Sequence, residues 1–109
     1  VMIQVNLAKE PQKSGTSEDE TDPLAEHIRS LPHLRLIGLM TMPPYFNSPE
    51  KVRPYFRALK DLGNRIRTEA IANVDMAELS MGMTDDFELA IEEGATHVRV
   101  GRAIFGSRH

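Results

Sequence analysis

Apolar residues occur along this chain in blocks of two kinds. Residues 34–42 form an almost uninterrupted apolar run closed by Pro43 and Pro44, which is typical of a parallel strand buried on both faces. The next block places apolar residues three and four positions apart, which predicts an amphipathic helix that opens near Pro54. The residues of its apolar face are Val52, Tyr55, Phe56, Leu59, Leu62 and Ile66.

The N-terminal part predicts a strand and a helix separated by a polar loop. Residues 2–7 contain β-branched side chains and no breaker, which predicts a strand. Residues 8–22 are polar and are expected to form a long loop. Asp22 and Pro23 then fit the start of a helix, with Asp22 as the N-cap and Pro23 at the first helical position, and Pro32 ends it.

The C-terminal part repeats this order of strand and helix. Residues 76–80 predict a third strand, and residues 96–101 predict a fourth. Between them, Thr84 or Asp85 is suited to cap a helix that ends at Gly94.

The alternation of strands and helices predicts an α/β fold with a parallel sheet. About four βα units of this length correspond to half of an eight-stranded TIM (β/α)8 barrel. Because a four-stranded sheet leaves two open edges, we expect residues 1–109 to be a single half-barrel unit that is incomplete, dimeric or wrapped by its own termini.

Composition excludes several classes of partner. The 109 residues are 40% hydrophobic and 27% charged, as in a soluble globular unit, and the net charge of −3 with scattered Lys and Arg argues against nucleic acid. The absence of cysteine and of a long apolar segment leads us to expect a cytoplasmic protein without a membrane partner. The four histidines lack the spacing of a metal-binding pair, so no metal site is expected.

Two strand ends in the C-terminal part open into turns of small residues. One is L-S-M-G-M-T-D-D-F over residues 79–87, and the other is V-R-V-G-R-A-I-F-G over residues 98–106. Such turns present main-chain N–H groups that can hold a phosphate without a basic side chain. Two of them side by side predict a phosphate site.

Arg99 lies in the last predicted strand, where it alternates with Val98 and Val100. In a barrel the two valines would pack outward beneath the helices, and Arg99 would point inward near the C-terminal end. Two alternatives follow: Arg99 pairs with a barrel carboxylate such as Glu78, or it faces a ligand. Its place at the end of a strand favours the ligand, because barrel sites are built there.

Several of these segments together closely resemble the pyridoxal phosphate homeostasis proteins, also called the proline synthetase co-transcribed homologues. The resemblance spans the whole chain, and its carriers are residues 1–6, Glu10, Lys13, Ser14, Gly15, residues 38–40, 79–87, 98–101 and 103–106. It implies the C-terminal half of a barrel like the N-terminal domain of alanine racemase, with pyridoxal 5′-phosphate at the C-terminal mouth. It also implies a cofactor carrier or regulator without established turnover, completed by a homodimer partner or by the missing N-terminal half.

The resemblance also implies which residues bind the cofactor. The side chains of Ser80 and Thr84 would hold the phosphate, and Arg99 would lie near the pyridine nitrogen. Main-chain N–H groups around Met81, Gly82, Met83, Gly101 and Arg102 would complete the cradle. Arg102 stands where many members have a small hydroxyl residue, and its side chain either contacts the phosphate or points to solvent.

One departure from the family concerns the lysine that forms the Schiff base. The family carries it at the end of the first barrel strand, in a segment that this sequence lacks, and none of Lys9, Lys13, Lys51 or Lys60 matches it. The resemblance therefore implies a non-catalytic binding protein. Two alternatives stay open: a fragment of a racemase-like enzyme, and a structural half-barrel that binds only phosphate or sulfate.

Overall fold

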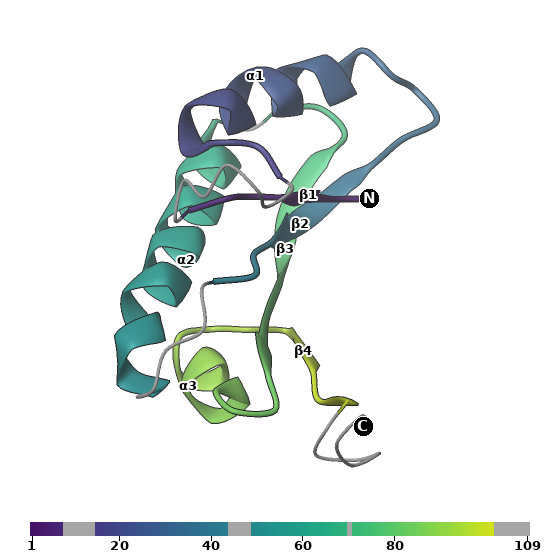
Figure 1. Cartoon of the computed structure of the whole chain (residues 1–109). Coiled ribbons are helices and arrows are strands. Elements are labelled where there is room, and N and C mark those ends of the chain that lie inside the picture. Colours follow the sequence, from purple (N-terminus) through teal and green to yellow (C-terminus); the bar gives the residue numbers. More distant parts are fainter. Residues whose placement is uncertain (8–14, 44–48, 70, 102–109) are drawn as a thin grey trace.

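A computed structural model of the chain describes residues 1–7, 15–43, 49–69 and 71–101 (Figure 1). Four strands form one parallel sheet in the order β1 (Met2–Gln4), β2 (Leu36–Met40), β3 (Val74–Met83) and β4 (His97–Arg99). The helices α1 (Glu18–Arg29), α2 (Arg53–Thr68) and α3 (Phe87–Glu92) follow β1, β2 and β3, and a 3-10 turn, η1 (Pro49–Val52), leads into α2. The predicted alternation of parallel strands and helices is confirmed.

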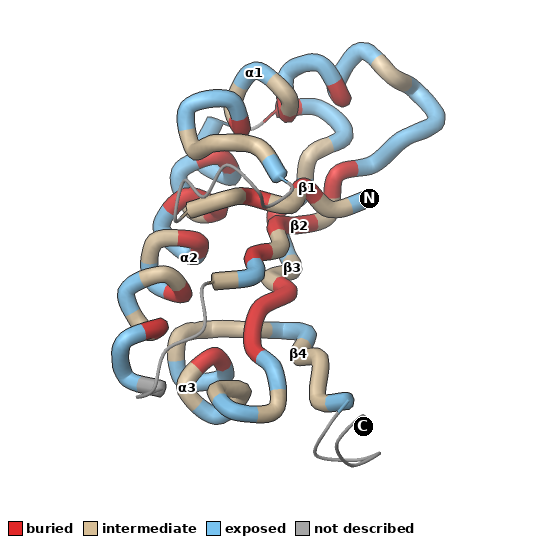
Figure 2. Tube along the Cα trace, in the orientation of Figure 1, coloured by how far each residue is buried: buried red, intermediate tan, exposed pale blue. Residues whose placement is uncertain are grey.

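Helix α2 covers one face of the sheet and, among the described residues, contributes four of the fifteen buried apolar residues, more than any other helix or strand. A Cβ placed on Gly63 of this helix would lie 3.6 Å from Leu79 of β3 and 3.7 Å from Leu39 of β2. The predicted apolar face of the helix is confirmed apart from Tyr55, which is only half-buried. Its buried members are Val52, Phe56, Leu59, Leu62 and Ile66, and Figure 2 shows these buried positions on the side of α2 that faces the strands.

The register of the strands separates the two faces of the sheet. Ile3, Leu39 and Leu79 are paired across β1, β2 and β3, and all three pack in the core. Because side chains alternate along a strand, their neighbours point to the opposite face. These neighbours form a second row, Gln4, Met40, Ser80 and His97, that crosses all four strands.

Helix α1 begins earlier than predicted. Its N-cap is Ser17, and Asp22 and Pro23 lie inside the helix, so the predicted start at Asp22 is wrong. The reason is a capping box: Glu20 N–H donates to Ser17 Oγ at 3.2 Å, and the Glu20 carboxylate accepts from Ser17. Three acidic residues in the first turn add favourable interactions with the helix dipole. Together these contacts offset the main-chain hydrogen bond that Pro23 cannot make.

Strand β3 also extends beyond its predicted end, through Met83 rather than Ser80. The next helix has Asp86 as its N-cap, so the predicted caps Thr84 and Asp85 are wrong. Gly94, with a φ of +106°, follows the end of α3 as predicted.

Candidate functional site

The carboxyl ends of the four strands are tied together by hydrogen bonds centred on Thr41. The N–H of Thr41 donates to the carbonyl of Ser80 at 3.1 Å, and its hydroxyl donates to the carbonyl of Val5 at 2.9 Å. The guanidinium of Arg99 donates from Nη2 to the carbonyl of Thr41 at 2.9 Å. Residues from β1 to β4 thereby meet at the edge where barrel folds place their ligands.

Arg99 is held at this edge with part of its donor capacity unused. Within the described residues its Nε is buried and has no hydrogen-bond partner. Burial lowers the pKa of the Arg99 guanidinium from its ordinary value, and the nearby charge of Asp86 partly opposes that shift. The guanidinium can therefore still donate to a group that enters the site.

The predicted alternative in which Arg99 pairs with the carboxylate of Glu78 is not observed. Glu78 instead lies 3.4 Å from Nδ1 of His97, and Arg99 bonds to a main-chain oxygen. The pairing of Arg99 with Glu78 is therefore wrong.

Ser80 lies on the same edge with its hydroxyl turned away from the core. Its neighbours Leu79 and Met81 pack into the core, so the Ser80 side chain points to the face that carries Met40. The residue is 8% exposed, and its hydroxyl makes no hydrogen bond within the part of the chain that the structure describes. Its predicted role as a phosphate ligand stays a prediction.

The middle of the L-S-M-G-M run serves packing. Met81 is fully buried in the core. Gly82 has a φ of +103°, and a Cβ there would lie 2.6 Å from Cβ of Ala90 and 3.3 Å from Cγ1 of Val98. The N–H of Met83, expected among the phosphate donors, donates to Oδ1 of Asp86 at 2.8 Å. Gly82 is thus required by the contact of β3 with α3 and β4.

The remaining predicted residues are distributed around this edge. Thr84 lies in the turn between β3 and α3. Gly101 lies just after β4, and a Cβ added to it would have no described atom within 4 Å. Among the described residues, the space beside the Gly101 Cα is therefore unfilled. Arg102 lies outside the described residues.

A hollow of about 310 Å³ lies between η1 and the start of α3. It is lined by Glu50, Thr84, Asp85, Asp86, Phe87, Glu88 and Leu89. Four carboxylates in this lining disfavour an anion, and the six residues of α3 make only a short helix with little dipole to offset them. An anion is better accommodated on the side of Ser80, Arg99 and Gly101.

Sequence reasoning missed two residues of this edge, Thr41 and Asp86. A polar residue at the end of an otherwise apolar strand was the available signal for Thr41. For Asp86 the signal was ambiguous, because the adjacent Asp85 is equally suited to cap a helix.

Similarity to a known protein family extends over the whole chain. Residues 1–109 match the family model described as alanine racemase, N-terminal domain. The chain belongs to this family. It is similar to proteins named pyridoxal phosphate homeostasis protein, with 48% identity over 108 residues to that of Aquifex aeolicus and 38% over 110 residues to that of Homo sapiens. Each alignment covers 99% of this chain but only 46% and 40% of these relatives, so the chain spans less than half their length.

Solved structures show the same arrangement of strands and helices. A crystal structure of an unknown protein from Bifidobacterium adolescentis is 39% identical with a TM-score of 0.86, and covers 95% of this chain and 42% of its own. PipY of Synechococcus elongatus with pyridoxal phosphate bound is 26% identical with a TM-score of 0.78, over 91% of this chain and 45% of its own. The four parallel strands and the helices between them thus form a partial TIM-barrel fold, as the sequence predicts.

Neither a membrane span nor a metal cluster occurs in the described parts of the chain. None of the helices in these ranges has the length and apolarity needed to span a bilayer. Within the same residues, no group of three or more His, Asp or Glu side chains is arranged to hold a metal ion.

Proposed function

We propose that the carboxyl edge of this sheet is the phosphate-binding side of a pyridoxal 5′-phosphate site, in a protein that binds this cofactor for its homeostasis rather than for catalysis. The observation that carries the proposal is the buried Nε of Arg99, which has no partner among the described residues at the edge where barrel sites are built. The names of the relatives and the cofactor bound to PipY support the choice of ligand.

The residues at this edge fit the two polar ends of the cofactor. The hydroxyl of Ser80 and the main-chain N–H of Gly101 would donate hydrogen bonds to a phosphate. The side chain of Thr84 and the main-chain N–H of Arg102 complete the proposed phosphate site. The main chain of Met81, Gly82 and Met83 adjoins it. The Met83 N–H joins the cradle only where Asp86 releases it.

Arg99 favours binding of the cofactor over catalysis of reactions on amino acids. Pyridoxal phosphate supplies an electron sink for such chemistry when its ring nitrogen is protonated. A guanidinium carries only donors, so Arg99 beside that nitrogen can bond to the unprotonated ring and disfavours the protonated one. This electrostatic preference supports a carrier or regulator.

The other side of the barrel is part of the same proposal. The relatives are more than twice as long as the matched region, which supports a site completed by an N-terminal half of a longer chain or by a second copy. Analytical ultracentrifugation with and without pyridoxal phosphate distinguishes the self-associating form from the monomer.

The function is tested by titrating the chain with pyridoxal 5′-phosphate and following absorbance and fluorescence. We expect saturable binding that inorganic phosphate displaces and that Arg99→Ala weakens. Arg35→Ala is the matched control, because Arg35 pairs with Asp75 at the opposite end of the strands. Absence of saturable binding by this chain contradicts completion by a second copy, and absence in the longer chain as well contradicts the proposal. Racemisation of L-alanine by the loaded chain contradicts the non-catalytic part of it.

A further inference from the structure

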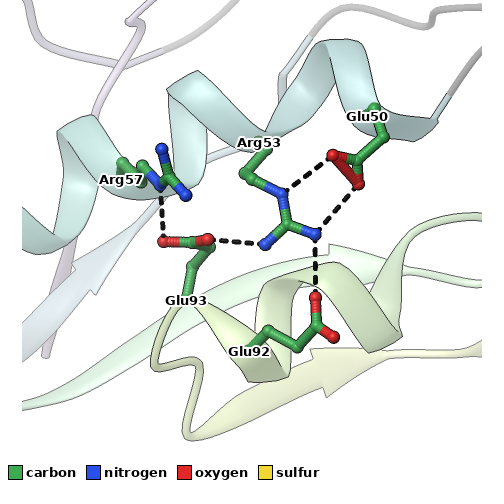
Figure 3. Close-up of polar contacts among 5 residues, drawn as sticks. All are labelled: Glu50, Arg53, Arg57, Glu92 and Glu93. Carbon is green, nitrogen blue, oxygen red and sulfur yellow. Dashed lines mark hydrogen bonds and ion pairs between the residues drawn. The ribbon is translucent and has the colours of Figure 1, made fainter.

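An ion-pair cluster joins the start of α2 to the end of α3. It consists of Glu50, Arg53, Arg57, Glu92 and Glu93, and Figure 3 shows the guanidinium of Arg53 at its centre. Arg53 binds Glu50 in a bidentate manner, with Nε at 3.1 Å and Nη2 at 2.9 Å. It also donates from Nη2 to Glu92 at 2.8 Å and from Nη1 to Glu93 at 2.6 Å.

This cluster differs from the other ion pairs of the described chain. The pairs Arg29–Glu26 and Arg35–Asp75 each join two exposed side chains, and Arg65–Asp22 joins an exposed arginine to a half-buried aspartate; pairs open to solvent contribute little. The side chains of Arg53 and Glu93 are only 19% and 13% exposed. One guanidinium that binds three carboxylates in a fixed fork geometry restrains all the elements that carry them.

Those elements form the two walls of the hollow beside the proposed site. Glu50 belongs to η1, and Thr84 to Leu89 form the opposite wall. Helix α3 has only six residues and connects the Arg53 cluster at its C-terminal end to Asp86 at its N-terminal end. Asp86 in turn holds the end of β3 through Met83. Arg53 is therefore linked to the turn of residues 84–86 through one short, packed element.

The cluster also balances charge at the C-terminal end of α3 and beside the hollow. Glu92 and Glu93 lie at the C-terminal end of α3, where the helix dipole is unfavourable for carboxylates. Arg53 and Arg57 offset them, and Arg53 also offsets Glu50 in the lining of the hollow. Loss of Arg53 leaves three carboxylates with less compensation on this side of the molecule.

We propose that Arg53 is a positioning residue that fixes the turn of residues 84–86 against η1 and thereby sets the affinity of the site for the phosphate group of its ligand. The second half of this statement rests on the proposed function. The first half concerns only the protein and can be measured without a ligand.

The experiment compares Arg53→Gln and Arg53→Lys with Lys51→Gln in the full chain. Lys51 is exposed on η1 and makes no ion pair within the described residues, so its variant matches the change of charge without breaking the cluster. Amide hydrogen exchange reports the order of residues 83–90. Dissociation constants for pyridoxal 5′-phosphate, inorganic phosphate and pyridoxal separate the phosphate from the ring.

We expect faster exchange in the turn of residues 84–86 for both Arg53 variants and unchanged exchange for Lys51→Gln. Arg53→Gln should raise the dissociation constants of pyridoxal phosphate and inorganic phosphate about tenfold, as loss of one charge-assisted hydrogen bond does, and that of pyridoxal by less than about twofold. Arg53→Lys keeps the charge but loses the fork, so we expect an intermediate effect.

Unchanged exchange in the turn overturns the positioning role, whatever the ligands do. A variant Arg53→Lys that binds phosphate like the unaltered chain overturns it too, because charge alone then accounts for Arg53. Equal losses for pyridoxal phosphate and pyridoxal overturn the link to the phosphate. If neither the unaltered chain nor the longer chain binds pyridoxal phosphate, the proposed function and the link to phosphate fail, and the exchange measurement still decides the positioning role.

Discussion

Arg99 on β4 reaches across the end of β3 and donates a hydrogen bond to the main-chain oxygen of Thr41, 58 positions earlier in the chain. Neighbouring strands lie about 4.8 Å apart, so only a long side chain can span the intervening strand. The contact closes the carboxyl edge of the sheet on the side of Ser80. It also orients the guanidinium while its Nε stays without a partner in the described residues. A single side chain thus contributes to the fold and to the candidate site.

Replacing Thr41 by valine separates these two contributions. The variant loses the hydroxyl bond to the carbonyl of Val5 but keeps the carbonyl that accepts from Arg99. Because Thr41 is 1% exposed and the Val5 oxygen is left without this donor, we expect the free energy of unfolding to fall by about 1–2 kcal/mol. Urea denaturation measures this loss. The dissociation constant for pyridoxal phosphate should stay within about twofold, and a larger change would show that the Thr41 hydroxyl takes part in binding.

Gly82→Ala tests whether this glycine serves packing. The new Cβ would lie 2.6 Å from Cβ of Ala90, and the positive φ of Gly82 is unfavourable for alanine. We expect a loss of about 2–3 kcal/mol in the free energy of unfolding from overpacking and backbone strain together. Gly101→Ala is the matched control, because no atom of the described residues lies within 4 Å of its added Cβ. Equal thermal midpoints for the two variants contradict the packing role.

The order of the elements can be predicted because periodicity reports burial directly. The apolar spacing in α2 and the continuous apolar run of β2 each follow from which faces are covered. The start of α1 is harder to predict, because two signals for a helix N-terminus occur within seven residues. Ser17 with Glu20 and Asp22 with Pro23 both fit a helix start, and only the contacts of the folded chain distinguish them.

The candidate site is less predictable for a different reason. Glycine is typical of turns, yet Gly82 lies inside the longer strand β3. Its positive φ and lack of a side chain allow the close approach of Ala90. Arg99 was expected to meet a ligand or a carboxylate, but a main-chain carbonyl carries no side-chain signal in the sequence. The location of the site at strand ends follows from topology, whereas its individual hydrogen bonds depend on tertiary geometry.

Asp86 is expected to affect anion binding and stability in opposite ways. Asp86→Asn keeps an oxygen that can accept from the Met83 N–H but removes a negative charge near Arg99. We expect it to lower the dissociation constant for inorganic phosphate about threefold, through weaker repulsion at a partly exposed site. Isothermal titration calorimetry at low salt measures this change.

Asp86→Ala removes the acceptor as well as the charge. The Met83 N–H then loses its partner, and we expect the free energy of unfolding to fall by about 1 kcal/mol. A phosphate affinity in Asp86→Asn that is equal to or weaker than that of the unaltered chain contradicts the electrostatic part of this prediction.

The Arg53 cluster should make stability depend on acidic pH. Hydrogen bonds from Arg53 and then Arg57 hold the pKa of Glu93 below its ordinary value of 4.5, and a hydrogen bond from Arg53 lowers the pKa of Glu50. A carboxylate whose pKa is lower in the folded than in the unfolded chain stabilises the fold above the unfolded pKa. This contribution is lost as pH falls from about 4.5 through the folded pKa. We therefore expect the urea midpoint of the unaltered chain to fall between about pH 6 and pH 3.

In Arg53→Gln this fall should be smaller, because Glu50 and Glu93 then have pKa values closer to those of the unfolded chain. Lys51→Gln changes the net charge equally and leaves these hydrogen bonds intact, so its pH dependence should match that of the unaltered chain. The comparison uses urea midpoints of all three proteins at both pH values. An equal fall in Arg53→Gln would assign the acid sensitivity to other carboxylates, such as Asp75, whose pKa is lowered by its hydrogen bond from Arg35.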